Sequence, residues 1–323
     1  MIKEKILKLL NNLVLKTPIV AQGTRHLKKI IQTEMKRYGS YCNLNHIDTS
    51  HITDMSGLFM NSGFQGNISK WDVSNVKNMN GMFYFCDFNG DISGWNTSSV
   101  TNMGNMFIRS KFNGDISGWN TSSVTNMGNM FIRSKFNGDI SGWNTSKVEN
   151  MSTMFTHSLF NKDISHWDTS KVENMSTMFA HSNFNGDISA WNVENVENMC
   201  AMFAYSKFNG DISRWNTSKV TNMQEMFSSS EFNADISEWD ISKVENMLHM
   251  FYNAKFSGNL DKWMPMRLET IKDIFQSCSI SEPYWAMIDT KQDRKNAIQS
   301  YHCKKDLDII IEKKMVNKKS FKI

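Results

Sequence analysis

The side chains that could carry chemistry recur at a fixed spacing of 24 residues. An aspartate closes a Phe-Asn-Gly-Asp stretch and returns in seven consecutive places, with asparagine at either end: Asp91, Asp115, Asp139, Asp163, Asp187, Asp211 and Asp235, flanked by Asn67 and Asn259. Catalysis needs unlike groups that converge on one point, not one acid repeated along a line. We interpret these carboxylates as turn residues that bond backbone amides. A ladder of oxygens that binds Ca²⁺ between repeats is the alternative, although the glycine-rich nonapeptide of calcium β-rolls is missing.

Histidine and cysteine form no recognisable catalytic or metal motif. His157 and His181 lie one repeat apart and lack a third ligand within either repeat, which argues against zinc. The five cysteines are an odd number without a CxxC pair, and we expect buried, reduced thiols: Cys42, Cys86, Cys200, Cys278 and Cys303. We therefore predict no metal, no cofactor and no enzyme activity. An activity confined to residues 280–323 is the least favoured hypothesis, because that segment has no nucleophile–base motif.

The same period places two unbroken registers of aromatic residues. One register is Trp71, Trp95, Trp119, Trp143, Trp167, Trp191, Trp215, Trp239 and Trp263; the other is Phe64, Phe88, Phe112, Phe136, Phe160, Phe184, Phe208, Phe232 and Phe256. A unit of 24 residues cannot bury its own apolar face, whereas stacked units share a continuous core. The sequence therefore predicts a solenoid of about ten repeats over residues 40–279, with helical caps over 1–39 and 280–323.

Within one repeat, the apolar spacing predicts a short strand and a short helix. Met103, Met106, Phe107 and Ser110 follow the i, i+3, i+4, i+7 pattern of a helix face, and Asn102 before them suits a helix N-cap. Residues 92–97 alternate like a strand, and Val or Ile replaces Thr97 in other repeats, so this position is expected to point inward. The position of Ser110 is otherwise Cys or Ala, which indicates a small buried side chain.

This layout of strand, loop and helix resembles the leucine-rich repeats. Within that class, the stretch SSVTNMGNMFIRS at 98–110 resembles the repeat of the BspA-like family, with Met106 and Phe107 at its Ala-Phe position and Ser110 or Cys86 at its Cys position. The Trp-Asn-Thr-Ser and Asn-Met-x-x-Met-Phe pieces resemble a subfamily known mainly as repeats of unknown function. The resemblance covers about three quarters of the chain. It implies an open, right-handed α/β solenoid and, more weakly, adhesion or partner binding.

Charge is divided unevenly between the array and its flanks. Residues 1–39 carry +7 and residues 280–323 carry +4, so a net charge of +4 leaves −7 on the array. An acidic array argues against nucleic acid as a partner. The segment 1–16 is expected to be a capping helix rather than a secretory signal, and a second helix is expected over 25–38. No stretch reaches transmembrane length, a cytoplasmic location is favoured over the cell surface, and a monomer is expected.

Variation against this regular background marks a candidate binding ridge. The position two residues after the helix Phe holds large aromatic, Arg or His side chains in six consecutive repeats: Phe85, Arg109, Arg133, His157, His181 and Tyr205. Such residues are enriched at protein interfaces, although a solvated outer edge made alike by recent duplication is the alternative. The uniform polar positions around Ser93 and Asn96 could instead match a repeating glycan, or could form ladders that stabilise stacking.

These observations favour a non-enzymatic scaffold that binds a protein partner, of unknown identity, along one face. A surface adhesin that recognises host protein or glycan is the alternative.

Overall fold

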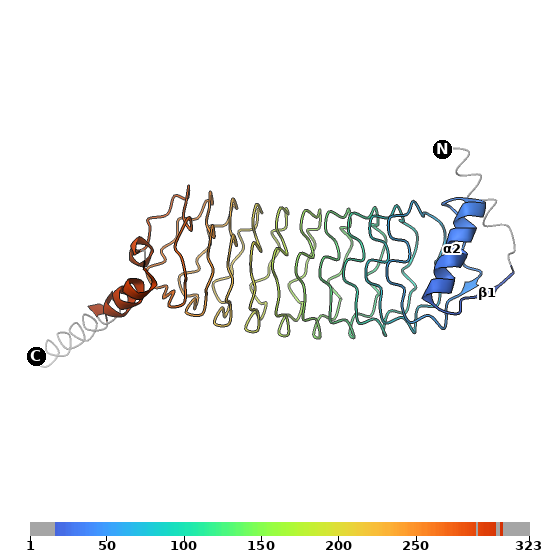
Figure 1. Ribbon diagram of the computed structural model, residues 1–323, viewed down its shortest axis with the longest axis horizontal. Coiled ribbons are helices and arrows are strands. Elements are labelled where there is room, and N and C mark those ends of the chain that lie inside the picture. Colours follow the sequence, from blue (N-terminus) through green and yellow to red (C-terminus); the bar gives the residue numbers. More distant parts are fainter. Residues whose placement is uncertain (1–16, 289, 302–303, 306–323) are drawn as a thin grey trace, which may run out of the picture.

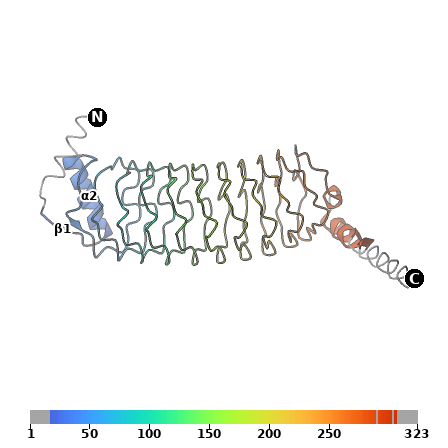
Figure 2. The same cartoon turned by 180° about the vertical axis from the view of Figure 1, so that it is seen from behind.

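The protein is a stack of similar coils along one long axis. A computed structural model describes residues 17–288, 290–301 and 304–305. Its coils, one for each 24-residue repeat, lie side by side, with the N-terminal helix across one end and C-terminal helical residues at the other (Figures 1 and 2). Repeating units with a shared aromatic core are consistent with the predicted solenoid. The predicted helix over 1–16 lies outside the described residues.

Regular secondary structure is confined to the ends of the array. The α-helix α2 spans Thr24–Tyr38, as predicted. The strands β1 (Ile19–Val20) and β2 (Ile47–Asp48) pair in parallel, the 3-10 helix η1 spans Tyr284–Met287, and residues 291–301 are helical. The strand and helix predicted inside each repeat are wrong: residues 92–97 are turns and irregular chain, and residues 103–110 are a run of turns.

The turns at 102–110 and their equivalents, here called the turn column, replace the helix because their amides bond to the next coil. The N–H groups of Met103, Asn105, Phe107 and Arg109 donate to carbonyls one coil later at 3.0, 2.9, 2.9 and 2.8 Å. Positive φ at Asn105 (60°) and Arg109 (50°) turns alternate peptides so that these four N–H groups share one direction. In a helix, the same N–H groups would donate to carbonyls of their own coil.

The tryptophan register forms a buried column that also makes polar contacts between coils. Trp119 stacks on Trp95 with ring centroids 6.3 Å apart and planes 5° apart. The Trp119 indole Nε1 donates to the Ile92 carbonyl at 3.1 Å, and this bond to a residue 27 positions earlier recurs along the array. Trp285 of η1 extends the column: it stacks on Trp263 at 6.4 Å and donates to the Leu260 carbonyl at 3.0 Å.

Two other expectations, for Thr97 and Asn102, can be compared with the contacts in each coil. Thr97 is buried as predicted, and its hydroxyl donates to the Asn120 carbonyl at 3.0 Å. Asn102 accepts a hydrogen bond from the Gly104 amide at 3.0 Å, but it closes a turn and caps no helix. In the Phe-Asn-Gly-Asp turn, a Cβ on Gly90 would lie 2.7 Å from the Phe88 ring, so close packing favours glycine there.

Each end of the core is covered by a different device. At the N-terminal end, α2 buries Leu27, Ile30 and Ile31, and the Thr24 hydroxyl donates to the Asp54 carbonyl at 2.5 Å. At the C-terminal end, the buried Arg294 donates from Nη1 to the Leu268 carbonyl at 2.8 Å. In the described part of the chain, no helix combines the length and hydropathy needed to cross a membrane.

Replacement of Trp167 by Phe is expected to lower the free energy of unfolding by about 2–4 kcal/mol. The change leaves a void beside Trp143 and Trp191 and removes the donor to the Ile140 carbonyl. Urea unfolding measures the effect. Thr169→Val is the control, because it also removes a hydroxyl bond between coils while Val already occupies this position elsewhere. A smaller loss for Trp167→Phe than for Thr169→Val would contradict the role of the indole.

Two buried alanines of one coil test the cost of the left-handed backbone. Ala201 has a φ of 51°, whereas Ala204 is not among the residues with positive φ, and both side chains are buried. Both lose a methyl group on mutation to Gly, but only Ala201→Gly relieves a strain of roughly 1–2 kcal/mol. We therefore expect Ala204→Gly to be the more destabilising by about that amount. Equal losses in thermal or urea unfolding would show that the turn column carries no such strain.

Candidate partner-binding surface

The sequence-predicted ridge lies along one edge of the turn column. Its ten positions all have positive φ, between 49° and 60°, and their side chains project from the last turn of each coil: Asn61, Phe85, Arg109, Arg133, His157, His181, Tyr205, Ser229, Asn253 and Ser277. The six large members, here called the ridge, are all exposed. Because each backbone amide is held by a neighbouring coil, the ridge is a fixed row rather than a flexible loop.

The ridge side chains stack on one another. The rings of His157 and His181 lie 4.2 Å apart and nearly parallel, and Tyr205 continues the stack at 4.4 Å from His181. The Arg109 guanidinium lies over the Phe85 ring, 5.6 Å from its centre. Stacking hides ring faces and turns ring edges outward. Parallel imidazoles at this distance cannot both aim a nitrogen at one ion, and the described residues hold no group of three metal-binding side chains.

Positive charge on the ridge is confined to its N-terminal half, at Arg109 and Arg133. Burial lowers the pKa of His157, and the neighbouring His181 and Arg133 lower it further. Burial, with Arg133 nearby, also lowers the pKa of His181. Both imidazoles are therefore mainly neutral at pH 7, while Arg109 and Arg133 stay cationic. From its N-terminal end, the ridge thus presents the Phe85 ring, two positive charges at Arg109 and Arg133, and three uncharged rings.

A second row of side chains runs beside the ridge and was not singled out by the sequence analysis. Lys111 pairs with Asp87 at 2.7 Å, whereas Lys135 has no ion pair among the described residues. Leu159, in the next coil, exposes 60% of its surface. In the sequence, Leu159 interrupts a series of polar residues at the position of Lys111 and Lys135, and this change could have identified the row. The row adds positive charge beside Arg133 and one apolar contact beside His157.

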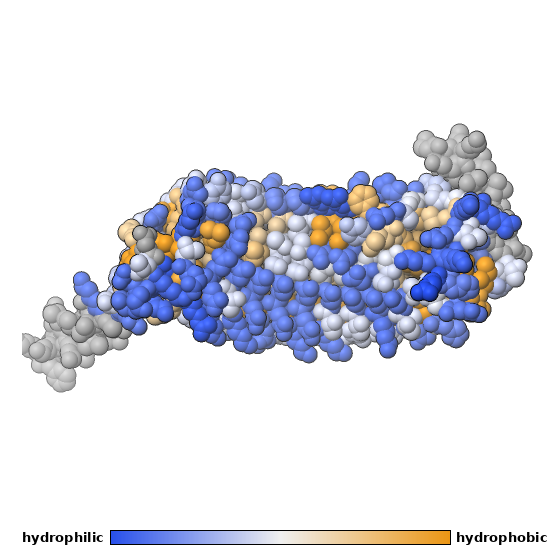
Figure 3. Space-filling view, viewed as in Figure 1, coloured by the Kyte–Doolittle hydropathy of each residue, from blue (hydrophilic) through white to orange (hydrophobic). Residues whose placement is uncertain are grey.

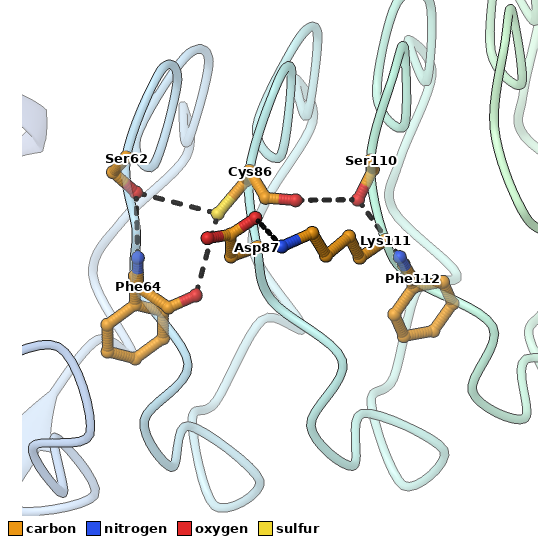
Figure 4. A network of polar contacts seen from close by, with 7 residues as sticks. All are labelled: Ser62, Phe64, Cys86, Asp87, Ser110, Lys111 and Phe112. Atoms are coloured by element: carbon orange, nitrogen blue, oxygen red, sulfur yellow. Dashed lines mark hydrogen bonds and ion pairs between the residues drawn. The ribbon is translucent and has the colours of Figure 1, made fainter.

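The predicted small-residue position, directly after the ridge position in each coil, makes polar contacts with neighbouring coils (Figure 4). The Ser110 hydroxyl accepts from the Phe112 amide at 3.2 Å and donates to the Cys86 carbonyl at 3.4 Å. Cys86 takes the place of this serine in its own coil, and burial raises the pKa of its thiol. Cys42 is also buried, and Cys200 and Cys278 are half-buried; Cys303 lies outside the described residues.

The repeated aspartates behave as turn residues. Asp91 accepts from the Ser93 amide at 3.0 Å and from its hydroxyl at 2.7 Å, and these two bonds lower the pKa of the carboxyl. Asn96 likewise bonds within its own turn, so these outward positions do not form the ladders between coils that were one prediction. Such a ladder runs instead through Asn89, which accepts from the Asn113 amide at 2.8 Å.

Another surface, near the middle of the array, carries charges of both signs. Glu149, Glu173 and Glu197 line a shallow hollow together with Lys171 and Lys219. Polar residues cover much of the visible side of the molecule, and apolar residues gather at the C-terminal end and in patches along its length (Figure 3).

The histidine pair predicts a fall in stability as the pH drops below 6.5. Because the pKa of each imidazole is lower in the folded chain, the unfolded chain binds protons first and gains stability. Urea unfolding at pH 7.5 and 5.5 should show a smaller free energy at pH 5.5. His157→Asn with His181→Asn should flatten this dependence, since Asn occupies the same position at Asn61 and Asn253. An unchanged pH dependence in the double variant would contradict the assignment.

Comparison with known protein families matches most of the chain to one family. The family described as "Mycoplasma protein of unknown function, DUF285" matches residues 29–135, 108–206 and 180–284. These three overlapping stretches together run from α2 to η1. The expected resemblance to a repeat family of unknown function is thereby confirmed. No curated protein and no solved structure matches the chain.

Proposed function

We propose that this chain, which belongs to the DUF285 family, is a non-enzymatic scaffold that binds a protein partner along the ridge. The proposal includes the finer assignment of the coils to a right-handed solenoid of the BspA-like, leucine-rich-repeat kind. The observation that supports partner binding is the exposed row of Phe, Arg, His and Tyr side chains in consecutive coils, held in place by the turn column.

The energetics of protein interfaces support a row of this composition. Tyr and Arg carry a large share of binding energy at interfaces, and rings that are already stacked lose little conformational entropy on binding. Phe85 and Tyr205 expose 50% and 52% of their surface at the two ends of the row. Aromatic residues and arginine are enriched at protein interfaces relative to the rest of the surface. The repeating carboxylates, by contrast, are already bonded within their own turns.

The proposal is tested by a variant that changes the ridge without straining its backbone. Asparagine is placed at Arg109, Arg133, His157 and His181, because it tolerates positive φ and stands in this position at Asn61 and Asn253. A photo-crosslinking amino acid at Tyr205 then captures the partner in cells that make the protein. We expect the four-asparagine change to reduce capture at least tenfold while the thermal unfolding curve keeps its shape.

A matched control changes the same residue types on another surface. His166→Asn with Arg214→Asn removes one imidazole and one guanidinium from exposed positions outside the ridge. Capture through Tyr205 should be unaffected. Equal capture by the four-asparagine variant and the control would remove the ridge as the binding surface.

A further inference from the structure

The two ends of the ridge are chemically unlike, and the difference restricts what can lie along it. This inference rests on the proposed function and adds the chemistry of the partner. In the N-terminal half, directly after Phe85, stand two cationic side chains, Arg109 and Arg133. At the other end, the stack stops at Tyr205, and the next coil offers only the small side chain of Ser229.

The cationic end has positive charge that the described residues do not neutralise. Arg109 is positioned by the Phe85 ring beneath its guanidinium, and neither Arg109 nor Arg133 forms an ion pair within the described chain. Lys135 lies two residues beyond Arg133 and is also unpaired there. Guanidinium groups bind carboxylates through two parallel hydrogen bonds. Carboxylates of a partner are the complementary groups.

The other end has a vacant place in the ring stack. His181 covers one face of the Tyr205 ring at 4.4 Å, and no ring of the following coil covers its other face. Ser229 is half-buried there, and its Oγ accepts from Asn253 Nδ2 at 3.4 Å. Neighbouring ridge rings lie 4.2 and 4.4 Å apart, so one coil provides the thickness of one further ring. A planar side chain of a partner would occupy this place, above Ser229 and against Tyr205.

The spacing of these two places matches an extended peptide. Arg133 and Ser229 are four coils apart, which is ~19 Å at the usual separation of neighbouring strands. An extended chain covers that length in about six residues, an even number, which places both side chains on the same face of the strand.

We propose that the ridge binds an extended acidic segment of the partner protein. In this complex, carboxylates lie over Arg109 and Arg133, and one aromatic side chain about six residues away stacks on Tyr205 above Ser229. The partner segment therefore runs along the solenoid axis rather than across it.

The probe is a nine-residue peptide of serine and threonine with aspartate at its first and third positions and tryptophan at its ninth. Its binding to the full chain is measured by fluorescence anisotropy in low salt. We expect measurable affinity that falls as salt is added. A peptide with lysine in place of aspartate should not bind, and moving the tryptophan to the fifth position should weaken binding about tenfold, to the level of a peptide without a ring.

One substitution tests the vacant place directly. Ser229→Tyr fills it with a side chain that the same position accepts at Tyr205, and should weaken binding of the aspartate–tryptophan peptide about tenfold. Ser277→Tyr, in the same position two coils later, is the matched control and should leave the affinity unchanged. Thermal unfolding of both variants shows whether they fold, and the tryptophan-spacing series on the unaltered chain is independent of either.

The results separate this inference from the function on which it rests. Failure of the aspartate peptide to bind, equal binding of the lysine peptide, or indifference to the tryptophan position each overturns the inference. If any of these occurs while capture through Tyr205 still depends on the ridge, the scaffold stands and only its partner chemistry is wrong. If capture does not depend on the ridge, the proposed function fails first.

Discussion

The hydrogen bond from each tryptophan indole to the preceding coil is the contact on which the array depends. All ten tryptophans make it, at 2.9–3.2 Å, from Trp71 through Trp285. One side chain thus fills part of the apolar core and also donates to a buried carbonyl of its neighbour. Each coil therefore depends on both neighbours: the Trp119 indole donates to Ile92 of the preceding coil, and the Ile116 carbonyl accepts from Trp143 of the next coil. The ends therefore require α2 on one side and Trp285 with Arg294 on the other.

The hydrogen bonds of the turn column align peptide dipoles along the array and fix the backbone of the ridge. Its four amides per coil point toward the C-terminal end, so their peptide dipoles add along the axis as they do in a helix. The positive end lies at the last coil, where Asp273 occupies the position of Asn105 and its carboxylate lies 3.7 Å from His249 Nε2. The same geometry requires positive φ at the ridge positions. A surface that can vary in chemistry, yet holds each side chain one coil from the next, follows from the way the core is built.

The sequence predicted which side chains point into the core, and it missed the features that depend on hydrogen bonds and stacking between neighbouring coils. The tryptophan and phenylalanine registers, the inward Thr97 and the small position of Ser110 follow from residue types at a fixed period. The helix was wrongly predicted because Met103, Met106 and Phe107 have helical spacing, and a run of turns gives the same inward pattern. Gly57, Gly81 and Asn105 hinted at positive φ. Thr153 and Thr177 occupy the same position. Because β-branched residues disfavour positive φ, their presence argued against a left-handed backbone there. The ridge was found through its variation in size, whereas its stacking and its neutral histidines required coordinates.

Hydrogen exchange of the indole N–H protons tests the central contact most directly. Selective ¹⁵N labelling of tryptophan gives one signal for each of the ten indoles. The structure predicts that all ten exchange slowly, with the terminal Trp71 and Trp285 least protected, because each proton is buried in a bond to the adjacent coil. Rapid exchange of the central indoles, at the rate of free tryptophan, would contradict the stacked column and the account built on it.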